Sequence, residues 1–236
     1  ATATGSTLWF GGTVPQALNI DGTLAGGYIR SLVVNNSSGA TPAVAINNSL
    51  AISNSFFMTF GSTGGPGTLT FGNFAASLTM ILTRVNGSLL TTPVFDPNVT
   101  FNATYNNSLV QTITGPELPS IVTGTFTIND PAGVLLNATT TAQKLALTNG
   151  TLTTAGTSLL KIAGTNPTDI TGGSNTSYVS GPLIRTLPSS LVPGTQYSFP
   201  VGKASFTPVT LVDPTTDADP PADYQIEITD GRWGTD

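Results

Sequence analysis

Leu32-Val33-Val34-Asn35-Asn36 and Phe126-Thr127-Ile128-Asn129-Asp130 are two copies of one pattern, a short apolar run that ends in Asn or Asp. Each copy is followed three residues later by a glycine, Gly39 or Gly133. Other short segments recur at nearly the same spacing of roughly 92 to 95 positions, as Leu50-Ala51-Ile52-Ser53 does in Leu145-Ala146-Leu147-Thr148. The near-constant spacing predicts an internal repeat, and the alternative is coincidence among strands rich in Thr, Gly and Leu.

Apolar runs of three to five residues alternate with clusters of Gly, Asn, Ser or Pro along this part of the chain. Such runs are typical of β-strands, and no window of helical length has a sustained 3.6-residue period. Each copy is too poor in apolar residues to form a core alone, so its strands must stack on those of neighbouring coils. The sequence therefore predicts an all-β protein, a parallel β-solenoid (β-helix) of short rungs over residues 8–164, with copies at about 8–72 and 99–164. A β-sandwich is the alternative fold.

The two ends of the chain differ from this central part. Residues 1–7 are uncharged and β-prone, and we expect a flexible leader that could add as a strand to a neighbouring molecule. Residues 165–236 contain more aromatic residues and prolines. Because an open solenoid end needs covering, this segment is predicted to form a small antiparallel β cap or sandwich, with an acidic loop at 213–223.

The composition excludes several classes of function. The chain has no Cys and no His, which excludes Ser-His-Asp and Cys-His catalysis and Cys-based zinc sites. Its net charge of −5 leaves no basic stripe for nucleic acid, and no apolar run is long enough to span a membrane. Only 8% of the residues are charged, against about 25% in ordinary globular proteins. A surface of Thr, Ser, Asn and Gly suits a secreted protein, or one that packs against copies of itself.

A set of segments gives the chain a family likeness: Val99-Thr100-Phe101-Asn102, Gln111-Thr112-Ile113, Phe126-Thr127-Ile128-Asn129-Asp130-Pro131-Ala132-Gly133-Val134, Leu147-Thr148-Asn149-Gly150-Thr151-Leu152-Thr153-Thr154, Gly172-Gly173-Ser174-Asn175-Thr176-Ser177-Tyr178-Val179-Ser180-Gly181-Pro182-Leu183, Arg185 and Phe199-Pro200-Val201-Gly202-Lys203. Their order resembles the repetitive extracellular surface proteins of Bacteroidetes-type bacteria, which are long Thr-, Asn- and Gly-rich chains with β-solenoid rungs. The resemblance is most specific over the C-terminal segments, which begin at Gly172. The earlier segments match only the general sequence character of β-solenoid rungs. It implies export, a place at the cell surface or in the extracellular matrix, an adhesive or structural role, and no active site.

Arg185 and Lys203 lie in the most specific part of the resemblance. We expect them to serve the structure, through pairing with Glu117, Asp169 or Asp213.

One acidic cluster predicts a calcium site. Carboxylates occur in a proline-containing loop at Asp213, Asp217, Asp219 and Asp223. Ca²⁺ takes six to eight oxygen ligands, which such a loop could supply in part. The glycine and distal Glu of an EF-hand are absent, and the alternative is a solvated connection stiffened by proline.

Aromatic residues near the two ends are candidates for partner contacts. Trp9, Phe10 and Trp233 could stack on surface glycans or on a protein partner, and the alternative is that they cover the ends of the core. A glycan-binding module is therefore the second function hypothesis. Ice binding ranks lower, because it needs a flat array of outward Thr side chains and the Thr positions are irregular.

A polysaccharide-degrading β-helix enzyme is a further alternative, because paired carboxylates cleave glycosides without His. Glu117, Asp130 and Asp169 are the candidate acids, although each lies in a turn-like context such as Asn129-Asp130-Pro131. The leading hypothesis is non-enzymatic: a structural or adhesive extracellular module, either a segment of a surface adhesin or a subunit of a filament that associates with copies of itself.

Overall fold

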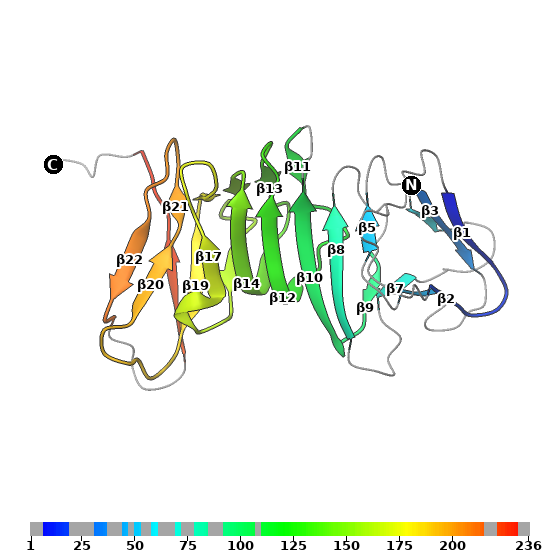
Figure 1. The fold of residues 1–236 in the computed structure, drawn as a ribbon, viewed down its shortest axis with the longest axis horizontal. Helices are drawn as coiled ribbons and strands as arrows, with labels where there is room; N and C mark the ends of the chain where they lie inside the picture. Colours follow the sequence, from blue (N-terminus) through cyan, green and yellow to red (C-terminus); the bar gives the residue numbers. More distant parts are fainter. Residues whose placement is uncertain are drawn as a thin grey trace. The chain divides into compact units, whose positions relative to one another are not determined.

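A computed structural model describes residues 7–18, 31–36, 44–46, 50–52, 58–60, 69–71, 78–84, 92–106, 110–214 and 221–230 (Figure 1). The chain divides into two compact units. The first comprises Ala1–Ser108 and Thr114–Gly124, and the second comprises Leu109–Ile113 and Thr125–Asp236.

The first unit consists of short parallel strands that the chain visits in turn on three sheets. The first sheet holds β1 (Thr7–Gly12), β3 (Ser31–Asn36) and β6 (Met58–Phe60). The second holds β2 (Gln16–Leu18), β4 (Val44–Ile46), β7 (Leu69–Phe71) and β9 (Val94–Phe95). The third holds β5 (Leu50–Ile52), β8 (Leu78–Arg84) and β10 (Val99–Asn106), with β8 beside β10 in Figure 1.

The second unit repeats this arrangement with two parallel sheets. One sheet holds β11 (Thr112–Ile113), β13 (Val134–Leu135), β15 (Leu152–Thr153), β18 (Val179–Ser180) and β21 (Val201–Gly202). The other holds β14 (Thr140–Asn149), which pairs with both β16 (Leu160–Ile162) and β17 (Ile170–Gly172), and β19 (Leu183–Leu187) on β16. Strand β12 (Ile121–Asn129) begins in the first unit and ends in the second.

The predicted all-β parallel β-solenoid is therefore confirmed, with successive coils as its repeats. Within the described ranges the only helical element is η1, a 3₁₀ turn at Pro167–Asp169. No helix in that part of the chain has the length and apolar character needed to cross a membrane. The boundaries of the two predicted copies, 8–72 and 99–164, stay a prediction.

Antiparallel pairing, as expected, occurs toward the C-terminal end. Strand β20 (Gln196–Phe199) pairs with β22 (Val209–Val212), and β23 (Ala222–Ile226) pairs with β19. Parallel pairing also continues in this region, because β18 lies between β15 and β21. The segment rich in aromatics and prolines thus supplies both solenoid rungs and the antiparallel strands that follow them.

The core is a set of inward columns built from the same position of successive coils. Along β10 the side chains of Val99, Phe101, Ala103 and Tyr105 are buried and alternate with more exposed residues. In the second unit, one column of side chains is fully inaccessible to solvent: Val134, Leu152, Val179 and Val201. Burial of each such side chain stabilises the fold by about 1.5–3 kcal/mol.

Gly150 lies where its backbone passes close to the backbone of the neighbouring coil. Its φ is +79°, and a Cβ atom built there would lie 1.7 Å from the carbonyl oxygen of Asp130. We expect Gly150→Ala to lower the free energy of unfolding by about 2 kcal/mol or more, because both backbone strain and a backbone clash oppose it. Chemical denaturation monitored by circular dichroism measures the change.

Gly156→Ala is the matched control, because a Cβ there meets nothing within 4 Å and no left-handed φ is required. It should change the free energy of unfolding by less than about 0.5 kcal/mol. Equal stability of the two variants would contradict the close approach at Gly150.

Candidate functional site

Six charged side chains are buried in the described part of the chain: Arg84, Asp96, Glu117, Asp130, Asp169 and Arg185. Burying a charge is costly unless it is paired or hydrogen-bonded, so each needs a structural or functional reason. The contacts of these six groups, and one cavity in the first unit, are the candidate sites of the molecule.

Arg84, Tyr105 and Glu117 form a buried cluster in the first unit. Arg84 ends β8 and stands in register with Tyr105 on β10, while Glu117 lies in the turn closed by the Leu118 N–H donating to the Gly115 carbonyl oxygen. The Arg84 guanidinium donates to the Glu117 carboxylate, and the Tyr105 hydroxyl donates to the same oxygen at 2.7 Å. The guanidinium carbon of Arg84 also lies 5.6 Å from the centre of the Tyr105 ring.

This cluster keeps Tyr105 protonated. Burial raises the pKa of the Tyr105 phenol well above its usual value of 10, and the neighbouring Glu117 carboxylate raises it further. Glu117 also accepts a hydrogen bond from the N–H of Gly115 at 2.9 Å, which fixes the turn. The three side chains therefore join two strands to a turn.

Asp96 and Asp130 close two turns of the same design. Each precedes a proline, and each carboxylate accepts the N–H two residues on, from Asn98 at 2.9 Å and Ala132 at 3.1 Å. Each backbone carbonyl accepts the N–H three residues on, and each backbone N–H donates at 2.9 Å to the carbonyl of a neighbouring coil, Phe71 or Asn149. Asp130 also accepts the Thr112 hydroxyl at 3.0 Å. These carboxylates hold corners of the solenoid.

Asp169 and Arg185 lie around η1 in the second unit. Asp169 accepts the N–H of Asn166 at 2.9 Å, and the Lys144 ammonium lies 3.7 Å from it. Arg185 is fully buried and stacks over the Tyr197 ring at 4.9 Å. Burial lowers the pKa of Arg185, and the charge of Asp169 opposes that shift.

The guanidinium of Arg185 donates to backbone carbonyl oxygens rather than to a carboxylate: those of Ser198, Asn166 and Pro167. Lys203 forms an exposed ion pair with Asp230 at 3.3 Å. The hydrogen-bond and ion-pair partners of these two cations differ from the predicted ones, Glu117, Asp169 and Asp213. Their structural role stays a prediction.

The three acids considered for glycoside cleavage all make the same kind of local hydrogen bond. Glu117, Asp130 and Asp169 each accept a backbone N–H two or three residues away. A carboxylate in such a turn stabilises the local backbone conformation. The hydrogen bonds of these three acids therefore support a structural role for them.

The predicted calcium loop is described only at its two ends. Asp213 has a φ of +46° and accepts the N–H of Gly194, while Asp223 accepts the Lys161 ammonium at 2.6 Å and the Thr186 hydroxyl at 2.7 Å. Burial acts to raise the pKa of Asp223, but the hydrogen bonds from Lys161 and Thr186 lower it overall. Asp217 and Asp219 lie outside the described residues.

Among the residues whose placement is described, no group of three or more acidic side chains could hold a metal ion. Calcium binding stays a prediction.

Of the predicted contact aromatics, Phe10 is buried in β1 at 7% exposure. Trp9 precedes it in the same strand, in register with Val33, and its side chain lies outside the described part. Trp233 also lies outside the described residues.

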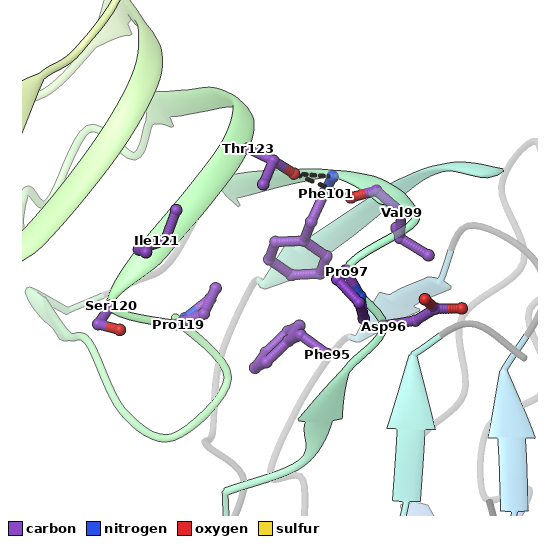
Figure 2. A pocket seen from close by; sticks show the side chains of 9 residues that line it. All are labelled: Phe95, Asp96, Pro97, Val99, Phe101, Pro119, Ser120, Ile121 and Thr123. Carbon is purple, nitrogen blue, oxygen red and sulfur yellow. Dashed lines mark hydrogen bonds between the residues drawn. The ribbon is translucent and has the colours of Figure 1, made fainter. Parts of the chain in front are cut away.

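The sequence did not reveal a cavity of about 420 Å³ in the first unit, between the start of β10 and the start of β12. Figure 2 shows Phe95, Phe101, Pro119 and Ile121 around it, with the carboxylate of Asp96 pointing away from the two phenylalanine rings. The remaining lining residues are Asp96, Pro97, Val99, Ser120 and Thr123.

The walls of this cavity are fixed by neighbouring contacts. The rings of Phe95 and Phe101 meet edge to face at 4.7 Å, and Phe71 stacks on Phe95 at 5.5 Å. The Thr123 hydroxyl accepts the N–H of Phe101 at 2.8 Å and donates to the Val99 carbonyl at 2.9 Å. The hydroxyl of Thr123 is thus used inside the wall, and the cavity is mainly apolar.

The cavity lies where the parallel sheet that contains β9 ends. Strand β9 ends its four-stranded sheet, and Pro119, across the cavity from Phe95, has no N–H to donate. The sequence signal that could have indicated it is Phe95 before the Asp96-Pro97 turn and Pro119 where a further rung would be expected.

Comparison with known proteins finds no matching family model, no matching curated protein and no matching solved structure. The likeness to Bacteroidetes-type surface proteins therefore stays a prediction.

Glu117→Gln tests whether the buried cluster is structural. The change leaves the Arg84 charge buried without its carboxylate, so we expect a loss of about 3–5 kcal/mol in the free energy of unfolding. Urea unfolding followed by tyrosine fluorescence measures it.

Asp230→Asn makes the same chemical change in the exposed pair with Lys203, whose side chains are 49% and 75% exposed for Lys203 and Asp230. Its cost should stay below about 1 kcal/mol. If Glu117→Gln is as mild as Asp230→Asn, the cluster does not hold the fold.

Proposed function

We propose that this chain is a non-enzymatic structural or adhesive module that works outside the cell, as a segment of a surface adhesin or as a subunit that associates with copies of itself. The observation that carries the proposal is the use of the buried charges. Glu117, Asp96, Asp130 and Asp169 each accept a backbone N–H of their own turn, and Arg185 donates to backbone carbonyls. Their hydrogen bonds thus serve the scaffold.

The surface supports the same proposal. Only 8% of the residues are charged, and along β10 the outward positions are Thr100, Asn102, Thr104 and Asn106. Such a surface can pack against a neighbouring molecule at a lower cost than a highly charged surface, because fewer charges must be desolvated. Large apolar side chains are also exposed on the described strands and on the segments between them: Val14, Ile81, Val110, Ile113, Ile121, Val192 and Val212.

Glycan binding is the second candidate. It is favoured by the half-buried ring of Phe95 in the cavity wall, because sugar rings stack on aromatic faces, and by the exposed Ser120 beside it. Saturable binding on a glycan array that is lost on Phe95→Ala, with the fold retained, would favour this candidate over the structural one.

Self-association is the direct test of the structural proposal. Sedimentation velocity of the purified chain should show a weight-average mass that rises with concentration. Because the contact would bury neutral and apolar surface, added sodium chloride should weaken it little, while sodium sulfate should strengthen it.

A chain that stays monomeric at every concentration and in sulfate would contradict the self-associating form of the proposal. Where the mass does rise with concentration, negative-stain microscopy of the same samples would distinguish filaments from small oligomers.

A further inference from the structure

The most exposed large apolar side chain of the described residues, Val192 at 72% exposure, lies on a rigid turn between β19 and β20. The turn is Val192-Pro193-Gly194-Thr195, closed by the Thr195 N–H donating to the Val192 carbonyl at 3.1 Å. Pro193 and Gly194, whose φ is +82°, occupy the two central positions that a type II turn favours.

A second contact fixes this turn to the neighbouring strand. The carboxylate of Asp213, just after β22, accepts the N–H of Gly194, and the backbone N–H of Asp213 donates to the Thr195 carbonyl at 3.3 Å. The turn therefore holds Val192 and Pro193 outward with little conformational freedom. Little entropy would be lost if the turn packed against another surface.

The cavity of the first unit is apolar, as the turn at Val192 and Pro193 is. Its walls are the rings and apolar side chains of Phe95, Phe101, Pro119 and Ile121, and Ile121 is itself 63% exposed. The one carboxylate of its lining, Asp96, is buried and bound to the turn that follows it. A charged ligand finds no opposite charge here, whereas a neutral apolar one gains contact with the half-buried ring of Phe95 and the exposed side chain of Ile121.

We propose that Val192 and Pro193 of one copy of this chain insert into the Phe95–Phe101–Pro119–Ile121 cavity of a second copy. The inference rests on the proposed function and names the contact by which copies associate. A cavity of about 420 Å³ has room for both side chains. Both surfaces are neutral and apolar, so neither requires desolvation of a charge.

The contact joins two different surfaces, because the turn belongs to the second unit and the cavity to the first. Each copy therefore carries one of each, and a bound pair still has one free turn and one free cavity. Such heterologous contacts build open chains or closed rings rather than two-fold dimers. The insertion covers a small area, so its affinity is weak and association depends on concentration.

Two charge substitutions test the contact. Val192→Asp on the turn and Ile121→Asp at the cavity should each weaken self-association roughly tenfold or more, since each would bury an unpaired carboxylate. Val14→Asp, at an equally exposed apolar position of 63%, is the matched control and should associate as the unaltered chain does. Circular dichroism checks that all three variants keep the fold.

Mixing the two variants is the decisive step. The Val192→Asp chain keeps its cavity and the Ile121→Asp chain keeps its turn, so the equimolar mixture should form dimers that grow no further. Sedimentation velocity of each variant and of the mixture measures this. Heterodimers from two chains that are monomeric alone would support the inference.

Three results would overturn it. If both variants associate as the unaltered chain does, copies associate through another surface and the proposed function stands without this contact. If the unaltered chain is monomeric throughout, the self-associating function fails together with the contact. If the mixture forms no dimer while Ile121→Asp loses binding on a glycan array, the cavity is a glycan site.

Discussion

In-register parallel stacking of short coils is the constraint on which the rest of this structure depends. Each strand has only two to ten residues, so no coil can bury a core alone. The column Val134, Leu152, Val179 and Val201 solves this by placing one apolar side chain of each coil directly on the next, with solvent fully excluded. Backbone hydrogen bonds between coils then run along the same direction as the apolar contacts.

The corners of the coils account for most of the buried carboxylates. At each corner the chain leaves the ladder, and its backbone groups need partners other than strands. Asp96 and Asp130 supply these partners in two turns of one design, and Glu117 supplies them in a third. Because these carboxylates hold the turns, freeing any one of them would leave backbone N–H groups of its turn without their partner.

The sequence predicted the architecture better than the sites. Short apolar runs between turn-forming residues indicated stacked coils, and Asn129-Asp130-Pro131 was identified as a turn. The recurring segments Leu32-Val33-Val34 and Phe126-Thr127-Ile128 nevertheless lie in different sheets, in β3 and β12. The limits of each individual coil were harder to predict from the sequence. The stacked positions 112, 134, 152, 179 and 201 of one column are unevenly spaced along the chain.

The unpredicted sites all depend on register between coils. Arg84 meets Glu117 across 33 positions, and the cavity needs Phe95, Phe101 and Pro119 from different parts of two coils. Uneven loop lengths decide which residues face one another, and local pattern does not encode them. Val192 was missed for another reason, since an exposed apolar residue on a turn has no sequence signal beyond the Pro193-Gly194 pair that follows it.

One substitution measured at two positions tests the stacked column most directly. Val179→Thr places a hydroxyl in the fully buried column and should lower the free energy of unfolding by about 1–3 kcal/mol. Val212→Thr makes the same change at a side chain that is 59% exposed and should cost less than about 0.5 kcal/mol. Equal free energies of unfolding for the two variants would contradict the claim that the inward column holds the coils together.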